Sequence, residues 1–174
     1  SCVQPSKLVF ANPSQRRSFV CMVAKEVPGS SRGKIKDAKH FGPVDNTEVF
    51  EVTVRLRRKA ELERHDDTSF MSDANPAQRT YLSREQYEES YGADQGDIDK
   101  VVAFAKEHEL KVVDISVARR SVLLSGNAKL FSKAFGTEIG KFELDGGTYR
   151  LRSGSITVPE SLVDAVEGVF GIDN

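Results

Sequence analysis

The side chains that could bind a metal or act as a nucleophile are few in this chain, and they are far apart. It contains three histidines, His40, His65 and His108, and two cysteines, Cys2 and Cys21. No group of these residues has the spacing of metal ligands, and an isolated histidine is usually a solvated side chain. The two cysteines could pair, or they could both be free thiols.

The carboxylates that lie next to each other are equally unsuited to acid–base chemistry. Asp66-Asp67 and Glu88-Glu89 are adjacent in sequence, and neighbouring side chains point apart on a helix or a strand. Gly146-Gly147 indicates a turn and not a phosphate-binding loop, because no helix start follows it. The sequence also lacks the nucleophile-elbow, P-loop, dinucleotide-binding and zinc-protease motifs. We therefore expect no catalytic residue, no metal site and no bound cofactor in this chain.

The charge distribution narrows the choice of partners. The 174 residues carry a formal net charge of -1, but residues 1–40 hold eight basic and two acidic side chains, and the remainder is acidic. An acidic globular part argues against nucleic acid as a partner, because phosphate neutralisation needs a basic surface. No stretch approaches the roughly 20 apolar residues of a membrane span.

The N-terminal segment differs from the rest of the chain. Residues 1–41 are rich in Ser, Pro, Lys and Arg and show no sustained period of 2 or 3.6, which is typical of a disordered segment. Residues 1–21 could be an extension upstream of a native start at Met22, or part of a genuine flexible head. We place the folded domain at residues 42–174.

Two types of hydrophobic periodicity follow within this domain. Residues 47–58 alternate, with Phe50, Val52, Val54 and Leu56 on one side, and this predicts a strand with one buried face. Residues 59–80 form a polar connection interrupted by Asn75-Pro76. Helices are predicted after Ser83, after Asp94 or Asp97, and over residues 128–135, where Gly136 has the position of a C-cap glycine.

The remaining elements complete the pattern. Residues 111–117 are expected to form a strand with Val113, Ile115 and Val117 on one side, and an apolar strand with Val122, Leu123 and Leu124 follows. Residues 137–144 are the next strand, and Asp145-Gly146 predicts a hairpin into residues 148–152. Val158-Pro159 predicts a last helix reaching about Glu167.

Without the extra hairpin strand and the C-terminal helix, this order is βαββαβ. It predicts an α+β, ferredoxin-like fold, in which two helices cover one face of a four-stranded antiparallel sheet. The opposite face would carry Glu51, Thr53, Arg55, Arg57, Asp114 and Ser116. A polar outer face is the default for such a sheet and by itself needs no partner.

Several stretches resemble the activation domain, or propeptide, of the kumamolisin/sedolisin family of serine-carboxyl peptidases. They are GPVDNTEVFEVTVRLRR (42–58), YLSREQYEESYGADQGDIDKVVAFAKEHEL (81–110), SVLLSGNAKLFSKAFGTEI (121–139) and LDGGTYRLRSGSITVPESLVDAVEGVFGIDN (144–174). They occur in the family's order over residues 42–174, whereas the first forty residues match nothing in it.

The resemblance implies a role for the chain. A sedolisin propeptide assists folding of the downstream peptidase domain in cis and blocks it until acid-triggered autocleavage. The catalytic residues and the calcium site belong to that downstream domain, and the nucleophile motif Ser-Gly-Thr-Ser is absent here. We expect the precursor to be exported.

The resemblance also implies a peptidase-facing surface. We expect it to comprise the six residues of the polar sheet face together with the last four residues, which would enter the peptidase cleft as an extended strand. These last residues are Gly171, Ile172, Asp173 and Asn174. Carboxylates such as Glu51 or Asp114 would lose ion pairs with the peptidase as the pH falls.

Two other functions are compatible with the same fold. One is a small acylphosphatase-like hydrolase, for which the chain lacks a Gly-rich phosphate loop after the first strand. The other is a ligand-sensing regulatory domain that dimerises through its sheet. The fold alone does not choose among these functions.

Overall fold

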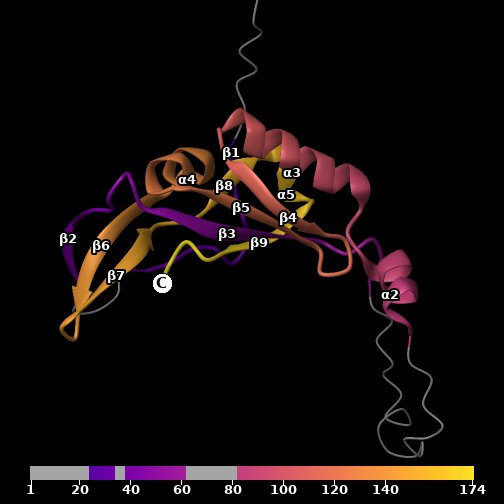
Figure 1. The fold of residues 1–174 in the computed structure, drawn as a ribbon, viewed down its shortest axis with the longest axis horizontal. Coiled ribbons are helices and arrows are strands. Elements are labelled where there is room, and N and C mark those ends of the chain that lie inside the picture. The colour runs from indigo at the N-terminus through magenta and orange to yellow at the C-terminus, as the bar shows by residue number, and fades with distance from the viewer. Residues whose placement is uncertain (1–23, 34–37, 62–81) are drawn as a thin grey trace, which may run out of the picture.

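An antiparallel four-stranded sheet lies at the centre of the computed structural model, which describes residues 24–33, 38–61 and 82–174. The strand order is β4-β5-β3-β9, and two helices lie over one face of the sheet (Figure 1). The elements are β3 (Val49–Leu56), α3 (Gln95–Glu107), β4 (Lys111–Ser116), β5 (Ser121–Asn127), α4 (Ala128–Phe135) and β9 (Val166–Phe170). This arrangement confirms the predicted ferredoxin-like fold.

The alternation of β3 and β5 explains why the two central strands pack against the helices. Val52 and Val54 of β3 are buried, and they lie opposite the buried Leu124 and Val122 of β5. Phe131 of α4 is also fully buried in this core. Burial of each such side chain contributes on the order of 1.5–3 kcal/mol to folding.

The predicted helix ends are confirmed by their capping residues. Ser83 and Gln86 form a capping box at the start of α2 (Arg84–Tyr91), and Asp94 caps α3. Asn127 caps α4, which ends at Gly136 in the left-handed conformation. A side chain at residue 136 would also clash, because its Cβ would lie 2.2 Å from the Thr157 hydroxyl oxygen.

The fourth strand of the central sheet is not the predicted one. Residues 137–144 were expected there, but β6 (Glu138–Leu144) and β7 (Gly147–Ser153) form a hairpin that joins β2 (Lys39–Pro43) in a separate three-stranded sheet. The fourth position is occupied by β9. The predicted last helix is shortened to α5 (Glu160–Val163), because residues 166–170 alternate and Gly168 disfavours a helix.

A β-bulge changes the predicted alternation of β4. The register shifts between Val112 and Asp114, so that Val112 lies opposite Leu124 and Ile115 lies opposite Val122. The prediction that Val113, Ile115 and Val117 share a face is therefore wrong, since the extra residue of the bulge separates Val113 from the other two. Asp114 remains on the face for which it was predicted.

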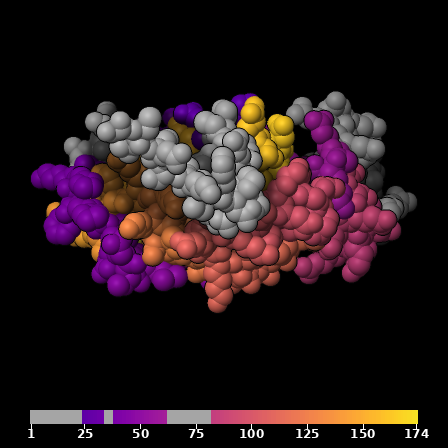
Figure 2. Space-filling model, turned by 90° about the horizontal axis from the view of Figure 1, so that it is seen from above, coloured from indigo at the N-terminus to yellow at the C-terminus, as the bar shows by residue number. Residues whose placement is uncertain are grey.

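Part of the segment predicted to be disordered is folded. β1 (Ala24–Glu26) pairs with β8 (Thr157–Pro159), and β2 pairs with β6. These strands have three and five residues, too few to produce a clear period of 2. β2 and α2 lie at opposite ends of the molecule (Figures 1 and 2).

Several sequence predictions fall on residues that the structure does not describe. They concern residues 1–21, both cysteines, Met22, His65, Asp66-Asp67 and Asn75-Pro76. Of the helices within the described ranges, none has the length and apolar character required to span a membrane.

Candidate functional site

The candidate site is the face of the four-stranded sheet opposite α3 and α4, which we call the outer face. Its centre is a row of side chains that crosses all four strands, one residue from each. Thr53 of β3 lies between Leu123 of β5 and Phe170 of β9, and Leu123 lies opposite Asp114 of β4. No helix of the described part of the chain covers this face (Figure 1).

The apolar part of this row was missed by the sequence reasoning. Phe170 is 57% exposed, and its ring extends over Gly168, where a Cβ atom would lie 2.8 Å from the ring's Cζ. Leu123, on the other side of Thr53, is half-buried. The apolar run Val122-Leu123-Leu124 could have predicted it, because in a strand the middle of three consecutive residues points to the opposite face from the other two.

Asp114 and Arg55 of the outer face are paired within the chain. The Arg119 guanidinium donates to the Asp114 carboxylate at 2.9 Å, and both side chains are mostly exposed. The Glu167 carboxylate lies 3.3 Å from Nε of Arg55 and 2.8 Å from Nη1 of Arg120. Arg120 is almost fully buried and also donates to the Leu56 carbonyl at 2.9 Å. Glu167 therefore links an exposed arginine and a buried one.

The environment of Glu167 lowers its pKa. Partial burial, the largest influence, favours the neutral acid and acts in the opposite direction. It is outweighed by the combined effect of the Arg120 hydrogen bond and the positive charges of Arg120 and Arg55. The carboxylate is thus held ionised to a lower pH than an isolated glutamate.

The structure brings five of the six predicted polar residues together. Thr53, Arg55 and Asp114 are in or beside the central row, and Glu51 lies opposite Ser125 at the edge of the same face. Ser116 is half-buried and accepts a hydrogen bond from the Arg119 amide at 3.3 Å. Arg57 is exposed one residue beyond the end of β3.

The last four residues were expected to belong to the same surface, but their side chains are used elsewhere. Ile172 is only 2% exposed and belongs to the hydrophobic core. Asp173 and Asn174 are hydrogen-bonded to β7 of the other sheet. The tail therefore leaves the outer face immediately after Phe170.

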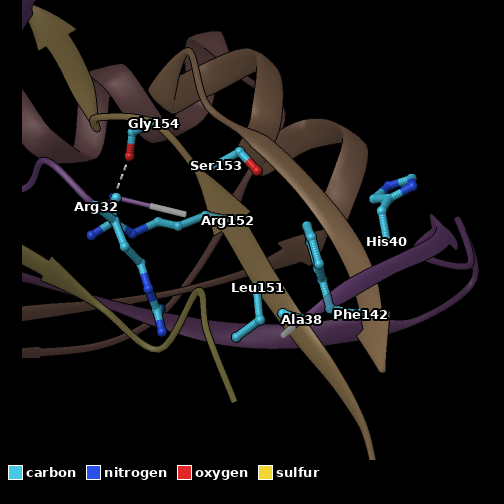
Figure 3. Close-up of a pocket in the computed structure, with 9 residues that line it drawn as sticks. Arg32, Ala38, His40, Phe142, Leu151, Arg152, Ser153 and Gly154 are labelled. Atoms are coloured by element: carbon cyan, nitrogen blue, oxygen red, sulfur yellow. Dashed lines mark hydrogen bonds between the residues drawn. The ribbon is translucent and has the colours of Figure 1, made fainter. Parts of the chain in front are cut away.

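The outer face and the three-stranded sheet each carry a hollow. A groove of about 420 Å³ crosses the outer face, and Thr53, Leu123 and Phe170 are among its lining residues. A larger hollow of about 650 Å³ lies on the three-stranded sheet between Phe142, Leu151 and Arg152 (Figure 3). Its arginines are engaged by protein groups, since Arg152 donates to the Gly154 carbonyl and Arg32 pairs with Asp173.

Neither hollow carries a metal-ligand set in the described ranges. Within residues 24–33, 38–61 and 82–174, no three or more His, Cys, Asp or Glu side chains gather as a metal site. The outer face thus combines an exposed aromatic ring with an exposed ion pair. The expectation that the chain has no cofactor stays a prediction.

Comparison with known proteins relates this surface to one family. The sequence model described as "Pro-kumamolisin, activation domain" matches residues 36–174, which include the outer face and the tail. Kumamolisin from Bacillus sp. (strain MN-32) is 35% identical over 147 residues, which cover 83% of this chain and 26% of the relative. Xanthomonalisin from Xanthomonas sp. (strain T-22) is 28% identical over 94 residues, covering 54% of this chain and 11% of that relative. The chain thus spans only a small part of the length of either relative.

Proposed function

The chain belongs to the pro-kumamolisin activation-domain family, the propeptides of sedolisin-type peptidases, and we propose that it binds its own peptidase domain through the outer face. Bound there, it inhibits the peptidase until acid-triggered autocleavage. The observation that carries this proposal is the central row of Asp114, Leu123, Thr53 and Phe170. The alternatives, an acylphosphatase-like hydrolase and a ligand-sensing domain, are not favoured by the family match.

The composition of the row supports a protein partner. Phe170 is 57% exposed, so binding of a partner over its ring would remove apolar surface from water. Aromatic residues with a neighbouring arginine are typical of the energetically dominant part of an interface. Phe170, with Arg55 and Arg119 nearby, would form this centre.

The same surface could assist folding of the peptidase. A domain with many non-local contacts folds slowly, because chain entropy must be lost before those contacts form. A preformed sheet that binds the partly folded peptidase would stabilise the transition state for its folding. Catalysis is assigned to the peptidase domain, as is any calcium site.

Acid release would follow from carboxylates at this interface. Glu51 is exposed on the outer face and has no ion pair among the described residues, so it is free to pair with a cation of the peptidase. Asp114 is already paired with Arg119 and would have to exchange partners. Protonation of an interface carboxylate would remove its ion pair as the pH falls.

Inhibition measurements with matched variants test the proposal. The purified chain is added to its mature peptidase, and peptide hydrolysis is followed at neutral and at acid pH. Thr53→Arg places a large charge in the central row, whereas Ala103→Arg places the same charge on the exposed side of α3. We expect Thr53→Arg to weaken inhibition by about tenfold or more, and Ala103→Arg to leave it unchanged.

Two results would contradict the proposal separately. If the wild-type chain does not affect the peptidase, the inhibitory role is wrong. If it binds equally well at neutral and acid pH, inhibition stands and the acid-release step is wrong.

A further inference from the structure

The last four residues form a docked tail whose contacts are with this chain's own three-stranded sheet and N-terminal segment. We call Gly171–Asn174 the tail. It follows β9 directly, and the structure describes it completely. Its position matters because any peptidase domain that follows must be connected through it.

The tail begins with a turn that only glycine adopts easily. Gly171 has a φ of 94°, and a Cβ at this position would lie 2.9 Å from the Glu51 carbonyl oxygen. The turn takes the chain off the edge of β3 after Phe170. It also directs the Ile172 side chain into the core, where it is 2% exposed.

Arg150 of β7 holds the backbone of this turn. Its Nε donates to the Ile172 carbonyl at 2.8 Å, and its Nη2 lies 3.4 Å from the Gly171 carbonyl. The guanidinium stacks 3.7 Å above the Phe50 ring and pairs with Glu48 at 2.8 Å. Arg150 is only 9% exposed, so its partners are fixed by packing on all sides.

The end of the tail occupies the free edge of β7. The backbone N–H of Asn174 donates to the Arg150 carbonyl at 3.0 Å. The side-chain oxygen of Asn174 accepts from the backbone N–H of Arg150. The Asp173 carboxylate accepts from the Arg152 amide at 2.6 Å and pairs with Arg32 of the N-terminal segment. Figure 3 shows Arg32 beside Arg152 at this point. Two backbone N–H groups and one carbonyl of the β7 edge are thus paired by the tail.

We propose that the tail is an anchor that fixes where the chain leaves the domain, and that Arg150 is its positioning residue. Residues 171–174 then do not enter the peptidase cleft. The segment that is cleaved during maturation begins beyond Asn174, a conclusion that rests on the proposed function. The anchor itself does not depend on that function.

Trimming from the C-terminus tests the anchor without the peptidase. The 174-residue chain, extended by a short Gly-Ser segment, is incubated under native conditions with a carboxypeptidase of broad specificity, and the intact mass is followed. An exopeptidase needs an extended, free chain end, so we expect trimming to stop at Asn174. Removal of residues 171–174 from the folded wild-type chain would overturn the proposal.

Variants separate positioning by Arg150 from general stability. In Arg150→Met, we expect the tail to be trimmed at least about tenfold faster. The tail can then detach from β7 without breaking hydrogen bonds to the carbonyls of residues 171 and 172. Arg150→Lys should restore part of the protection, since an ammonium group can still reach a carbonyl. Val101→Ala lowers global stability from α3, which packs on β4 and β5 and not on β7, and should leave the tail protected. Equal trimming in Val101→Ala and Arg150→Met at matched stability would overturn the positioning role.

If Arg150→Met does not fold, Asp173→Ala and Asn174→Ala replace it, because both change the edge of β7 without emptying a buried site. Loss of protection in either variant supports the anchor, and full protection in both contradicts it.

The position of the maturation cleavage is tested in the full-length precursor. After activation in acid, the N-terminus of the released peptidase is determined by mass spectrometry and is expected to lie beyond residue 174. Cleavage within 171–174 would contradict the second part of the proposal even if trimming confirms the anchor. Failure of the chain to inhibit the peptidase would instead contradict the proposed function and leave the anchor standing.

Discussion

The outer face and the tail anchor use the same kinds of residue in opposite ways. On the outer face, Arg119 and Asp114 form an ion pair in which both side chains are exposed. In the anchor, Arg150 is buried, and it is satisfied by a carboxylate, two carbonyls and an aromatic ring. Water can replace the partners in the first case, whereas in the second its access is restricted, because the Arg150 side chain is only 9% exposed.

This difference indicates which polar groups are available to another protein. An exposed ion pair contributes little to folding stability, and its members can exchange partners at a low cost in free energy. A buried arginine that loses its partners leaves an uncompensated charge, so its contacts are kept. The outer face is accordingly suited to binding, and the anchor is suited to holding the chain in place.

The largest expected effect comes from removing one arginine from each region. Arg150→Met should lower the free energy of unfolding by roughly 2–4 kcal/mol, mainly because two carbonyls lose a charged donor, whereas Glu48 is partly exposed. Arg119→Met should lower it by less than about 1 kcal/mol. Urea denaturation followed by circular dichroism measures both values. Similar losses for the two variants would remove the distinction between the regions.

The next effect concerns binding and should appear only on the outer face. Phe170→Ala removes the exposed ring and should weaken inhibition of the peptidase by roughly 10–100-fold, or about 1.4–2.8 kcal/mol. The unfolding free energy should change little, since the ring is more than half exposed. Inhibition constants at neutral pH provide the measurement, and Phe41→Ala is the control, because Phe41 is also exposed but lies on β2. Equal weakening by the two variants would mean that Phe170 is not at the interface.

The residues that sequence reasoning placed correctly belong to local patterns. Ser83, Asp94 and Asn127 cap helices through hydrogen bonds that span two or three residues, and β3 shows its alternation directly. Such patterns hold the needed information within a few positions, which is why most polar residues of the outer face could be predicted.

The anchor could not be predicted because its contacts connect distant parts of the chain. Arg150 and Glu48 are 102 positions apart, and Asn174 is bonded to a strand edge 24 residues earlier. The burial of Ile172 depends on core residues from distant parts of the chain and not on its neighbours in sequence. β9 was missed for a related reason, since five residues beside a predicted helix show only a short alternation.

His108 differs from both regions, because it contains a buried polar atom without a partner in the described part of the chain. His108 follows α3, its Nδ1 is buried with no hydrogen-bond partner among the described residues, and its ring centroid lies 4.6 Å from that of Phe104. Burial is the main cause of its lowered pKa. Lys133 of α4 lowers it further, against an opposing effect of Glu107.

The sign of the resulting pH dependence follows from linkage. The folded state binds the proton less readily than the unfolded chain, whose histidine has the usual pKa of 6.5. Stability should therefore be complete above pH 6.5 and fall as the pH decreases through that value towards the lower pKa of the folded state. Urea denaturation between pH 8 and 5 should show this decrease in the wild type and less of it in His108→Gln. His40→Gln, at an exposed position, is the control, and an unchanged slope in His108→Gln would contradict the prediction.

The smallest effect is expected at Glu167, which joins the two kinds of environment because it pairs with the exposed Arg55 and the buried Arg120. Its pKa is lowered below the usual 4.5, so the stability it contributes is present above pH 4.5 and is lost as the pH falls through the folded-state pKa. Because the carboxylate is partly exposed and the amide oxygen of Gln can still accept a hydrogen bond from Arg120, Glu167→Gln should cost less than about 1 kcal/mol at pH 7. The difference between wild type and variant should shrink as the pH falls below 4.5, and Glu51→Gln should show no comparable difference. If the Glu167→Gln deficit does not shrink as the pH falls, the loss comes from packing, and this link between the exposed and buried arginines is not electrostatic.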